Sequence, residues 1–395
     1  MKITSFSSSP VGRLVPISGH DRRHNRAFEH HAFVANPLNQ EPELDGSTWK
    51  MVANAGRALA RLDQASRQIP DPGILRRPTL RREAQSTSAL EGTYAPIEEV
   101  LAAEAAAQPS GSAELREVMN YVEAADPAFR WVHQHRQVSV ALFAETQKIL
   151  VRGTSADTHD AGGVRTTQVV IGSPSGRVED ARFIPMPPDY GIEPALRDLS
   201  DWINNGKSRE PVISAAMAHY QSETIHPFND GNGRIGRLLI VLQLMIDGVI
   251  DEPLLTVSPW FEARRSEYQD HLAHVSATGD WVPWIRFFSS GLEASATDTA
   301  QRVDRMLKIR GEYVEKLKDA NVRGAIVRDI VDLLIEVPIV TAPGVARRLG
   351  KSLQGVNQAF EKLVGLGILD GPIGTYNRRF IARDILEAIT APLEA

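Results

Sequence analysis

The sequence predicts a mainly α-helical protein with a β-hairpin near its middle and a small helix-rich module at its C-terminal end. Three observations predict this fold class. Long stretches space apolar residues three and four apart, a β-branched stretch at residues 165–184 interrupts them, and the elements after residue 321 follow the order of a winged helix-turn-helix. The 395 residues, 42% of them hydrophobic, allow two or three domains with buried cores.

The first 110 residues form an N-terminal, mainly helical region. Residues 1–46 show little periodicity and predict an extended or weakly structured arm. Helices are expected at 48–67, at 79–92 and at 97–107, and the small polar stretch "QPSGSA" that follows marks a domain boundary.

Residues 111–295 form the helical core, which contains the hairpin at 165–184. Residues 296–320 look like a helical connector. Residues 321–395 then give three short helices and a small hairpin, the winged helix-turn-helix order.

Charge and composition exclude several classes of protein. A net charge of -5 argues against general attraction to nucleic acid or to an anionic membrane. The absence of cysteine excludes disulfides, thiolate nucleophiles and thiolate metal sites. The start of the chain lacks a signal-peptide core, and no apolar run approaches the ~20 residues of a membrane span, so we expect no membrane partner and a cytoplasmic location.

The stretch "IHPFNDGNGRIGRL" at 225–238 contains G-x-G-x-x-G, the pattern of a dinucleotide-binding turn. That turn requires a buried strand before the glycines, whereas "PVISAAMAHYQSETIHPF" has the composition and spacing of a helix. A Rossmann site is therefore not expected, and the chain has no G-x-x-x-x-G-K-[ST] loop.

As a helix, a loop and a second helix, the same stretch predicts an anion site. The backbone of "GNG" can gather its N–H groups at the positive end of the helix formed by "IGRLLIVLQLM". Arg234 and Arg237 share one helix face and can hold phosphate oxygens. Asp230 can ligate Mg²⁺, and His226 has a pKa suited to proton abstraction.

Taken singly, these residues also have structural explanations: an N-cap for Asp230, a solvated helix face for the two arginines and a helix-end histidine for His226. Taken together, they indicate phosphoryl or nucleotidyl transfer to a hydroxyl.

The stretch "HPFNDGNGRIGR" resembles the Fic family signature H-x-F-x-[DE]-G-N-G-R-x-x-R at every fixed position. Members of that family typically transfer AMP from ATP to a Ser, Thr or Tyr hydroxyl of a protein. The resemblance implies a role for each position: His226 as base, Phe228 as loop anchor, Asp230 as Mg²⁺ ligand, Gly231, Asn232 and Gly233 as phosphate cradle, Arg234 and Arg237 on the outer phosphates. The kinase-like Doc branch has Lys where this chain has Gly233.

A second motif lies upstream. In "TSALEG" the last turn of a predicted helix places Glu91 at the negative end of the helix dipole, where a carboxylate favours a cation as partner. The motif resembles the Fic inhibitory signature [ST]-x-x-x-E-[GN], with Thr87, Glu91 and Gly92 at the fixed places. The resemblance implies that Glu91 pairs with Arg237 and keeps it from the γ-phosphate; the alternative is a solvated glutamate.

The resemblance also covers the hairpin and a later stretch. The hairpin at 165–184 stands where the family has its flap, to which an extended segment of a target protein can add as a strand. In "LTVSPWFEARRSEYQDHL", Trp260, Phe261 and Tyr268 are candidates to stack on a nucleobase, or to pack in the core. Arg264 and Gln269 depart from the residues of many relatives, which leaves the base preference open.

The C-terminal module has eight basic against five acidic residues within 321–382, an excess of three that is opposite in sign to the whole chain. Gln354, Asn357 and Gln358 lie on the expected recognition helix, where they could meet base edges of DNA. Winged helices also serve in protein docking and dimerisation, and the sequence leaves both alternatives open.

The sequence thus predicts a protein adenylyltransferase that uses Mg²⁺ and ATP, is autoinhibited by Glu91, and modifies another protein or itself. One alternative is a DNA-binding regulator whose Fic core senses a nucleotide without catalysis. Another is removal of AMP by the same site, with Glu91 positioning water. The target protein and the oligomeric state, a homo-oligomer included, stay open.

Overall fold

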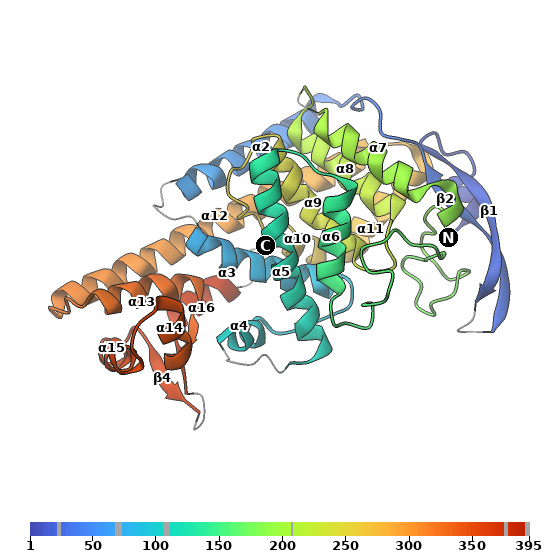
Figure 1. Ribbon diagram of the computed structural model, residues 1–395. Helices are drawn as coiled ribbons and strands as arrows, with labels where there is room; N and C mark the ends of the chain where they lie inside the picture. Colours follow the sequence, from blue (N-terminus) through green and yellow to red (C-terminus); the bar gives the residue numbers. More distant parts are fainter. Residues whose placement is uncertain (22–24, 68–72, 106–110, 207, 375–377, 392–395) are drawn as a thin grey trace. The chain divides into compact units, whose positions relative to one another are not determined.

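The computed structural model confirms a mainly helical chain with small antiparallel sheets, and it describes residues 1–21, 25–67, 73–105, 111–206, 208–374 and 378–391 (Figure 1). Two units divide the chain, and each is assembled from separate stretches of sequence. Unit 1 comprises Met1–Leu59, Glu123–Pro253 and Trp260–Ala294, and unit 2 comprises Ala60–Val122, Leu254–Pro259 and Ser295–Ala395. No helix among the described residues is long and apolar enough to cross a membrane.

Unit 1 holds the signature stretch. Its elements are α1 (Ile3–Phe6), β1 (Gly12–Asp21), β2 (Arg26–Ala35), α6 (Val140–Val151), a 3-10 turn (Pro188–Tyr190), α7 (Ile192–Asn204), α8 (Pro211–Ile225), α9 (Asn232–Ile246) and α11 (Arg265–Thr278). Four further helices have residues in both units: α2 (Gly46–Arg67), α5 (Ala113–His135), α10 (Ser258–Ala263) and α12 (Val282–Asp319).

Helices α8 and α9 pack against each other, with α7 on α8 and α6 on both α7 and α9 (Figure 1). Helix α8 starts at Pro211, a residue suited to the first turn, after Glu210, whose carboxylate accepts a hydrogen bond from the Ile213 N–H at 2.8 Å. Both helices are apolar on nearly all sides and buried along their length, as central helices must be. The chain thereby places the loop between them at a fixed position in unit 1.

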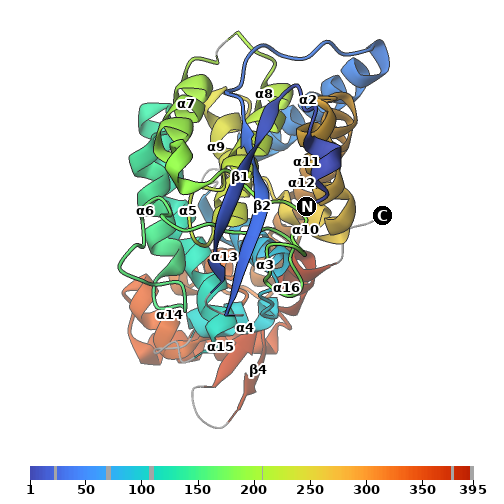
Figure 2. The same ribbon diagram turned by 90° about the vertical axis from the view of Figure 1, so that its right-hand side faces the viewer.

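The arm expected at residues 1–46, extended or weakly structured, is extended in Gly12–Asp21 and Arg26–Ala35, and the alternative of weak structure is wrong for these residues. Strands β1 and β2 form an antiparallel ribbon of ten residue pairs, from Gly12 opposite Ala35 to Asp21 opposite Arg26 (Figure 2). Histidines and a proline within the strands hide the alternation of apolar residues. The ribbon is stabilised by burial of Val15, Ala32 and Phe33 against a cluster that includes Phe183 and Ile184.

The stretch at 165–184 folds back on itself, but with less regular pairing than the expected hairpin. An isolated antiparallel bridge joins Ile171 to Phe183, and a parallel bridge joins Phe33 of β2 to Pro185. Gly172 has a φ of +64° at the turn that follows Ile171. The stretch is therefore held on the ribbon by a few main-chain bonds and by its buried apolar residues, which include Phe183 and Ile184.

Unit 2 contains α3 (Gly73–Leu90), α4 (Ile97–Ala105), α13 (Ala325–Glu336), β3 (Ile339–Thr341), α14 (Ala342–Leu349), α15 (Leu353–Gly365), β4 (Asp370–Ile373), β5 (Arg379–Ile381) and α16 (Arg383–Thr390). From α13 to β5 the elements follow the order expected for a winged helix, and the sheet has the strand order β3-β5-β4. The expected connector at 296–320 is the second part of α12, which has 38 residues. The boundary expected at residue 110 lies outside the described part of the chain.

Buried charges tie α3 to the rest of unit 2. Asp298 of α12 accepts hydrogen bonds from Arg82 at 2.6 Å and from two nitrogens of Arg302 at 2.9 Å each. The neighbouring Glu83 accepts from both the N–H, at 2.9 Å, and the hydroxyl of Ser258. Because buried charges are tolerated only when paired, these contacts define the position of α3 within unit 2.

Candidate active site

His226 directly follows the last residue of α8 and adopts a left-handed conformation, with φ +50° and ψ +63°. Its N–H donates to the carbonyl of Ser222 at 3.0 Å, which ends the helix. The ring Nδ1 lies 3.3 Å from the carbonyl of Glu223. Since a carbonyl can only accept, the proton is on Nδ1, and Nε2 is the nitrogen that can take a proton.

The loop after His226 is closed by Asn232. The Asn232 side chain accepts from the N–H of Phe228 and donates to the carbonyl of Phe228, both at 2.8 Å. The Phe228 ring is 1% exposed, as an anchor of the loop would be. The side chain of Asn232 thus holds the loop in shape. The main-chain N–H of Asn232 is the group that this residue can offer to a bound anion.

Helix α9 starts without a side-chain cap. The cap position is Gly231, with φ +84°, and a Cβ there would lie 2.6 Å from Cδ2 of Leu150. No other residue fits without strain and a shift of Leu150. The first-turn N–H groups and the positive end of the helix dipole therefore face the loop, an arrangement that favours a phosphate or another anion.

Both arginines of the signature are buried, each 2% exposed, and neither belongs to a solvated helix face. Nη2 of Arg234 lies 3.1 Å from Oδ1 of Asp230, whose side chain is 44% exposed. Oδ1 of Asp230 also accepts the N–H of Gly231 at 2.5 Å. A half-exposed carboxylate therefore lies at the mouth of the cradle, beside buried positive charge.

The carboxylate of Asp230 can be compared with what a Mg²⁺ ion needs. The described residues contain no group of three or more His, Asp or Glu side chains that could hold a metal ion. Mg²⁺ usually takes one or two carboxylates together with substrate phosphates. Asp230 at the mouth of the anion cradle fits a metal that arrives with a nucleotide, and it does not fit a metal held by the protein alone.

His219 has a structural role at this site that no local sequence motif indicates. Its Nδ1 donates to the carbonyl of Gly236 in α9, and its Nε2 accepts from the Tyr268 hydroxyl, both at 2.8 Å. Burial lowers the pKa of His219 to about 3, so the ring is neutral. The neutral ring holds α8, α9 and α11 together behind the signature loop.

The three aromatic candidates for a base pocket are all buried. Phe261 and Tyr268 stack on each other at 5.0 Å and both lie against His219, so their role in this structure is packing. Trp260 is 8% exposed, and the guanidinium of Arg264 covers its ring at 4.5 Å.

In unit 2, Glu91 follows the last residue of α3 and is exposed, while Thr87 is fully buried in the last turn. Gly92 has φ +93°, and the N–H of Thr93 bonds the carbonyl of Ser88 at 3.0 Å. This is the left-handed helix terminus that the glycine predicts. The carboxylate of Glu91 is therefore presented at the negative end of α3.

The polar residues expected on the recognition helix lie on α15. Gln354, Asn357 and Gln358 are exposed, and their spacing of three and four places them on one face. Val356, Ala359 and Phe360 on the opposite side are buried. The helix is thus amphipathic, with an amide-bearing face toward solvent.

Comparison with known proteins supports the expected family. Residues 49–130 match the Fic/DOC family N-terminal domain, and residues 137–244 match the Fic/DOC family domain. Protein adenylyltransferase fic-1 of Caenorhabditis elegans is 35% identical over 184 residues, which are 45% of this chain and 32% of that protein. Protein adenylyltransferase Fic of Drosophila willistoni is 31% identical over 170 residues, 41% of this chain and 31% of that protein. The chain thus spans about a third of the length of these curated relatives.

Solved structures agree on the fold. A Fic family protein from Desulfovibrio desulfuricans aligns with a TM-score of 0.56 at 20% identity, over 87% of this chain and 98% of that one. Fic-1 from C. elegans aligns with a TM-score of 0.51 at 26% identity, over 66% of this chain and 74% of that one. Residues 49–130 and 137–244 therefore carry the two domains of the Fic/DOC family, with the signature loop formed between α8 and α9.

Proposed function

We propose that this chain transfers AMP from Mg²⁺-ATP to a hydroxyl group of a protein. The observation that carries the proposal is the signature loop. In it His226, whose Nε2 can take a proton, stands six residues before the uncapped start of α9, and the first two turns of α9 carry two buried arginines. The Fic/DOC family match at 137–244 contains this loop, and relatives similar to 41–45% of the chain are named protein adenylyltransferase, which supports the same chemistry here.

In this mechanism Nε2 of His226 takes the proton of the acceptor hydroxyl as its oxygen attacks the α-phosphorus of ATP. The bond from the α-phosphorus to the bridging oxygen breaks, and pyrophosphate leaves. The first-turn N–H groups of α9, with Arg234 and Arg237, stabilise the charge on the phosphates. Mg²⁺, held by Asp230, would neutralise phosphate charge when bound.

The stretch at 165–184 is proposed to receive the target. An extended segment can add to it by main-chain bonds, next to the bridge between Ile171 and Phe183. Such bonds align a hydroxyl with His226 while reading little side-chain sequence. For the nucleobase, Trp260 remains our candidate contact, since Phe261 and Tyr268 are engaged in packing.

We also propose that Glu91 inhibits transfer by pairing with Arg237, with Thr87 fixing the end of α3. The support is the position of Glu91, an exposed carboxylate just beyond the end of α3, where the helix dipole favours a cation as its partner. In the inhibited state Arg237 would be denied to the γ-phosphate, and the α-phosphate would be misplaced for attack.

The test is incubation of Glu91→Gly with ATP labelled at the α-phosphate, followed by mass analysis of the labelled protein. We expect Glu91→Gly to label itself or an added target strongly, the parent to label weakly, and the double variant with His226→Ala to label nothing while still binding ATP. Equal labelling by parent and Glu91→Gly would remove the inhibitory role. Labelling that persists without His226 would remove the mechanism.

A second candidate function is DNA binding by the C-terminal module, favoured by the exposed amide face of Gln354, Asn357 and Gln358 on α15. Fluorescence polarisation with labelled duplexes at several salt concentrations tests it. DNA binding predicts an affinity that falls with salt and is weakened about ten-fold by Asn357→Ala. A module that docks protein instead shows no duplex binding at low salt.

A further inference from the structure

Arg165 stands at the start of the stretch that we expect to bind the target, and its environment is unusual. The residue is 1% exposed, yet no carboxylate lies within ion-pair distance of it in the described part of the chain. Burial without an acid lowers its pKa to about 10. A buried cation without a counter-ion is costly, so its hydrogen bonds must compensate for the lost hydration.

Those hydrogen bonds all go to main-chain carbonyls. Nε donates to His226 at 2.7 Å, Nη1 donates to Thr167 at 3.0 Å, and Nη2 donates to Met186 at 2.5 Å and to Ile225 at 3.4 Å. The Arg165 main-chain N–H also donates to the carbonyl of Pro227, at 2.9 Å. This one side chain therefore joins the end of α8 and the signature loop to Thr167, near the start of the expected flap, and to Met186, just beyond its end.

The contact to His226 bears on the imidazole directly. A non-glycine residue in the left-handed region is strained, and something must hold it there. The Arg165 bond fixes the carbonyl of His226 on one side, and the N–H of His226 is fixed by Ser222 on the other. With both peptide planes held, the direction of the Cα–Cβ bond is set, and the ring follows it.

A guanidinium suits this position and an ammonium does not. Five N–H donors in a planar fork reach carbonyls in several directions at once, whereas lysine has three donors at one point. Among the described residues, the Thr167 hydroxyl also joins these two segments, by donating to Oδ1 of Asn229 at 3.1 Å. Arg165 thus supplies several of the bonds that couple the flap to the signature loop.

We propose that Arg165 is a positioning residue that sets the distance between the acceptor hydroxyl, held on the flap, and Nε2 of His226. It touches neither ATP nor the hydroxyl, and it acts through the main chain of both segments. The inference rests on the proposed function for its effect on rate, but the coupling of flap and loop is a property of the fold.

Arg165→Lys tests the proposal in the full chain, with Arg182→Lys as the matched control. Arg182 lies in the same stretch but pairs with Asp270 and does not reach the catalytic loop. We expect Arg165→Lys to raise hydrogen exchange of amides in 167–171, 183–186 and 226–229 about ten-fold or more and to leave α9 unchanged. In the Glu91→Gly background it should lower kcat for self-labelling about a hundred-fold, with the KM for ATP within two-fold.

Two outcomes overturn the positioning role: exchange in the flap and the loop that matches Arg182→Lys, or a loss of ATP affinity equal to the loss of rate. If Arg165→Lys does not fold, Thr167→Val removes the additional bond without a buried charge and should raise exchange in both segments a few-fold. A Glu91→Gly protein with Arg165 intact that labels nothing counts against the proposed function, while the exchange measurement still decides the coupling.

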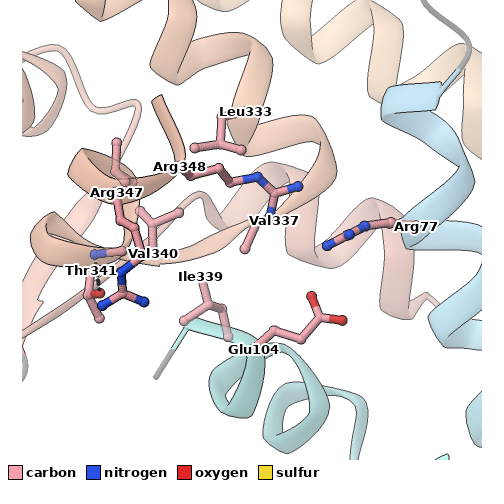
Figure 3. Close-up of a pocket in the computed structure, with 11 residues that line it drawn as sticks. Arg77, Glu104, Leu333, Val337, Ile339, Val340, Thr341, Arg347 and Arg348 are labelled. Atoms are coloured by element: carbon pink, nitrogen blue, oxygen red, sulfur yellow. Dashed lines mark hydrogen bonds between the residues drawn. The ribbon is translucent and has the colours of Figure 1, made fainter. Parts of the chain in front are cut away.

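A separate observation concerns unit 2. A cavity of about 420 Å³ lies against α14, a size in the range of small-molecule sites (Figure 3). Its apolar part is formed by five aliphatic side chains: Leu333, Val337, Ile339, Val340 and Val345. These residues are buried and belong to packed elements, so the cavity is preformed.

Positive charge surrounds this apolar surface. Glu336 is shared by two arginines, Arg77 of α3 at 3.1 Å and Arg348 of α14. Arg347 also lines the cavity and has no carboxylate partner among the described residues. Glu104, which approaches the cavity from α4, is paired with the buried Arg81. Of the charged residues that line the cavity, three are arginines and one is a glutamate.

We infer that this cavity binds a small organic acid whose carboxylate pairs with Arg347 and Arg348 and whose aliphatic body covers the five apolar side chains. No aromatic ring or side-chain amide lines the cavity, so it offers no surface for a nucleobase. The added anion would relieve the shortage of negative charge around Glu336.

Isothermal titration with octanoate as the probe tests the site, against 1-octanol, which lacks the charge, and inorganic phosphate, which lacks the apolar body. We expect one octanoate per chain, bound at least ten-fold more tightly than either comparison compound. Arg347→Gln should weaken it five-fold or more, and Arg323→Gln, an exposed arginine outside the cavity, should not. Equal binding of octanoate and octanol, no effect of Arg347→Gln, or no saturable binding would overturn the assignment.

Discussion

Asp298 provides the sharpest test of what holds α3 in place. Its carboxylate lies between two buried guanidinium groups, with side-chain exposures of 12% for Asp298, 10% for Arg82 and 8% for Arg302. Asp298→Ala leaves two buried cations without their shared anion. We therefore expect a loss well above that of an ordinary surface substitution.

The size of the loss of stability depends on the hydrogen bonds that each arginine keeps in Asp298→Ala. Arg302 retains hydrogen bonds to the carbonyls at the end of α16, at 3.0, 3.2 and 2.7 Å. Arg82 retains the hydroxyl of Thr256 at 3.3 Å among the described residues, which is weak compensation for a charge. Burial already lowers the pKa of Arg82, and Asp298 opposes that shift. Breaking such a pair costs about 3–5 kcal/mol, and the stranded Arg82 accounts for most of it.

Hydrogen exchange by mass spectrometry measures this loss locally, in peptides from α3 and α12, and urea unfolding measures it globally. The expected change is a hundred-fold to a few thousand-fold faster exchange, since about 1.4 kcal/mol is a factor of ten. Asp304→Ala, an exposed position on the same helix, is the control and should change stability by less than about 0.5 kcal/mol.

Adding Arg82→Met to Asp298→Ala should recover a large part of the loss, because no unpaired cation then remains on α3. An Asp298→Ala protein within about 1 kcal/mol of Asp304→Ala would refute the reasoning. Since Glu91 lies at the end of α3, the loosened variant should also show raised AMP transfer if Glu91 is inhibitory.

Three further expectations concern unit 1. Burial raises the pKa of Asp247 to about 7, so its contribution to stability is lost as the pH rises from about 4 to 7. Asp247→Asn should remove that dependence and stabilise the protein at pH 8 by roughly 1–2 kcal/mol, a value discounted for partial exposure, as measured by urea unfolding at pH 5 and 8. The low pKa of His219 means that stability falls as the pH drops below about 6.5, by up to about 1.4 kcal/mol per unit, and His219→Gln should flatten this slope. His226→Gly should be more stable than His226→Ala by roughly 0.5–1.5 kcal/mol in urea unfolding, because only glycine tolerates φ +50° without strain; the reverse order would show that no strain is present.

The signature loop could be predicted from the sequence because its parts are close neighbours along the chain. The positions of His226, Asp230 and Arg234 relative to a helix end and a helix start follow from local rules alone. The order of elements in the C-terminal module was predictable for the same reason, since each helix carries its own apolar face and cap.

Contacts between distant residues could not be predicted in this way. Arg82 and Asp298 are 216 residues apart, and Arg165 and His226 are 61 apart. In the sequence each is one charged residue among many, and nothing local marks it as buried. The β1–β2 ribbon escaped prediction because its apolar residues are buried against residues 178–184, a surface that exists only after folding.

The backbone conformation of the signature loop bears on the role of His226. Two left-handed residues, five positions apart, bracket it: His226 with φ +50° and Gly231 with φ +84°. Gly231 is glycine for a steric reason, since a Cβ would meet Leu150. At His226 glycine would relieve the backbone, yet the chain keeps a histidine and holds it with Arg165 and Ser222. A strained residue that is supported on both sides is the expected signature of a group kept for its chemistry, and this contrast supports His226 as the base independently of the family resemblance.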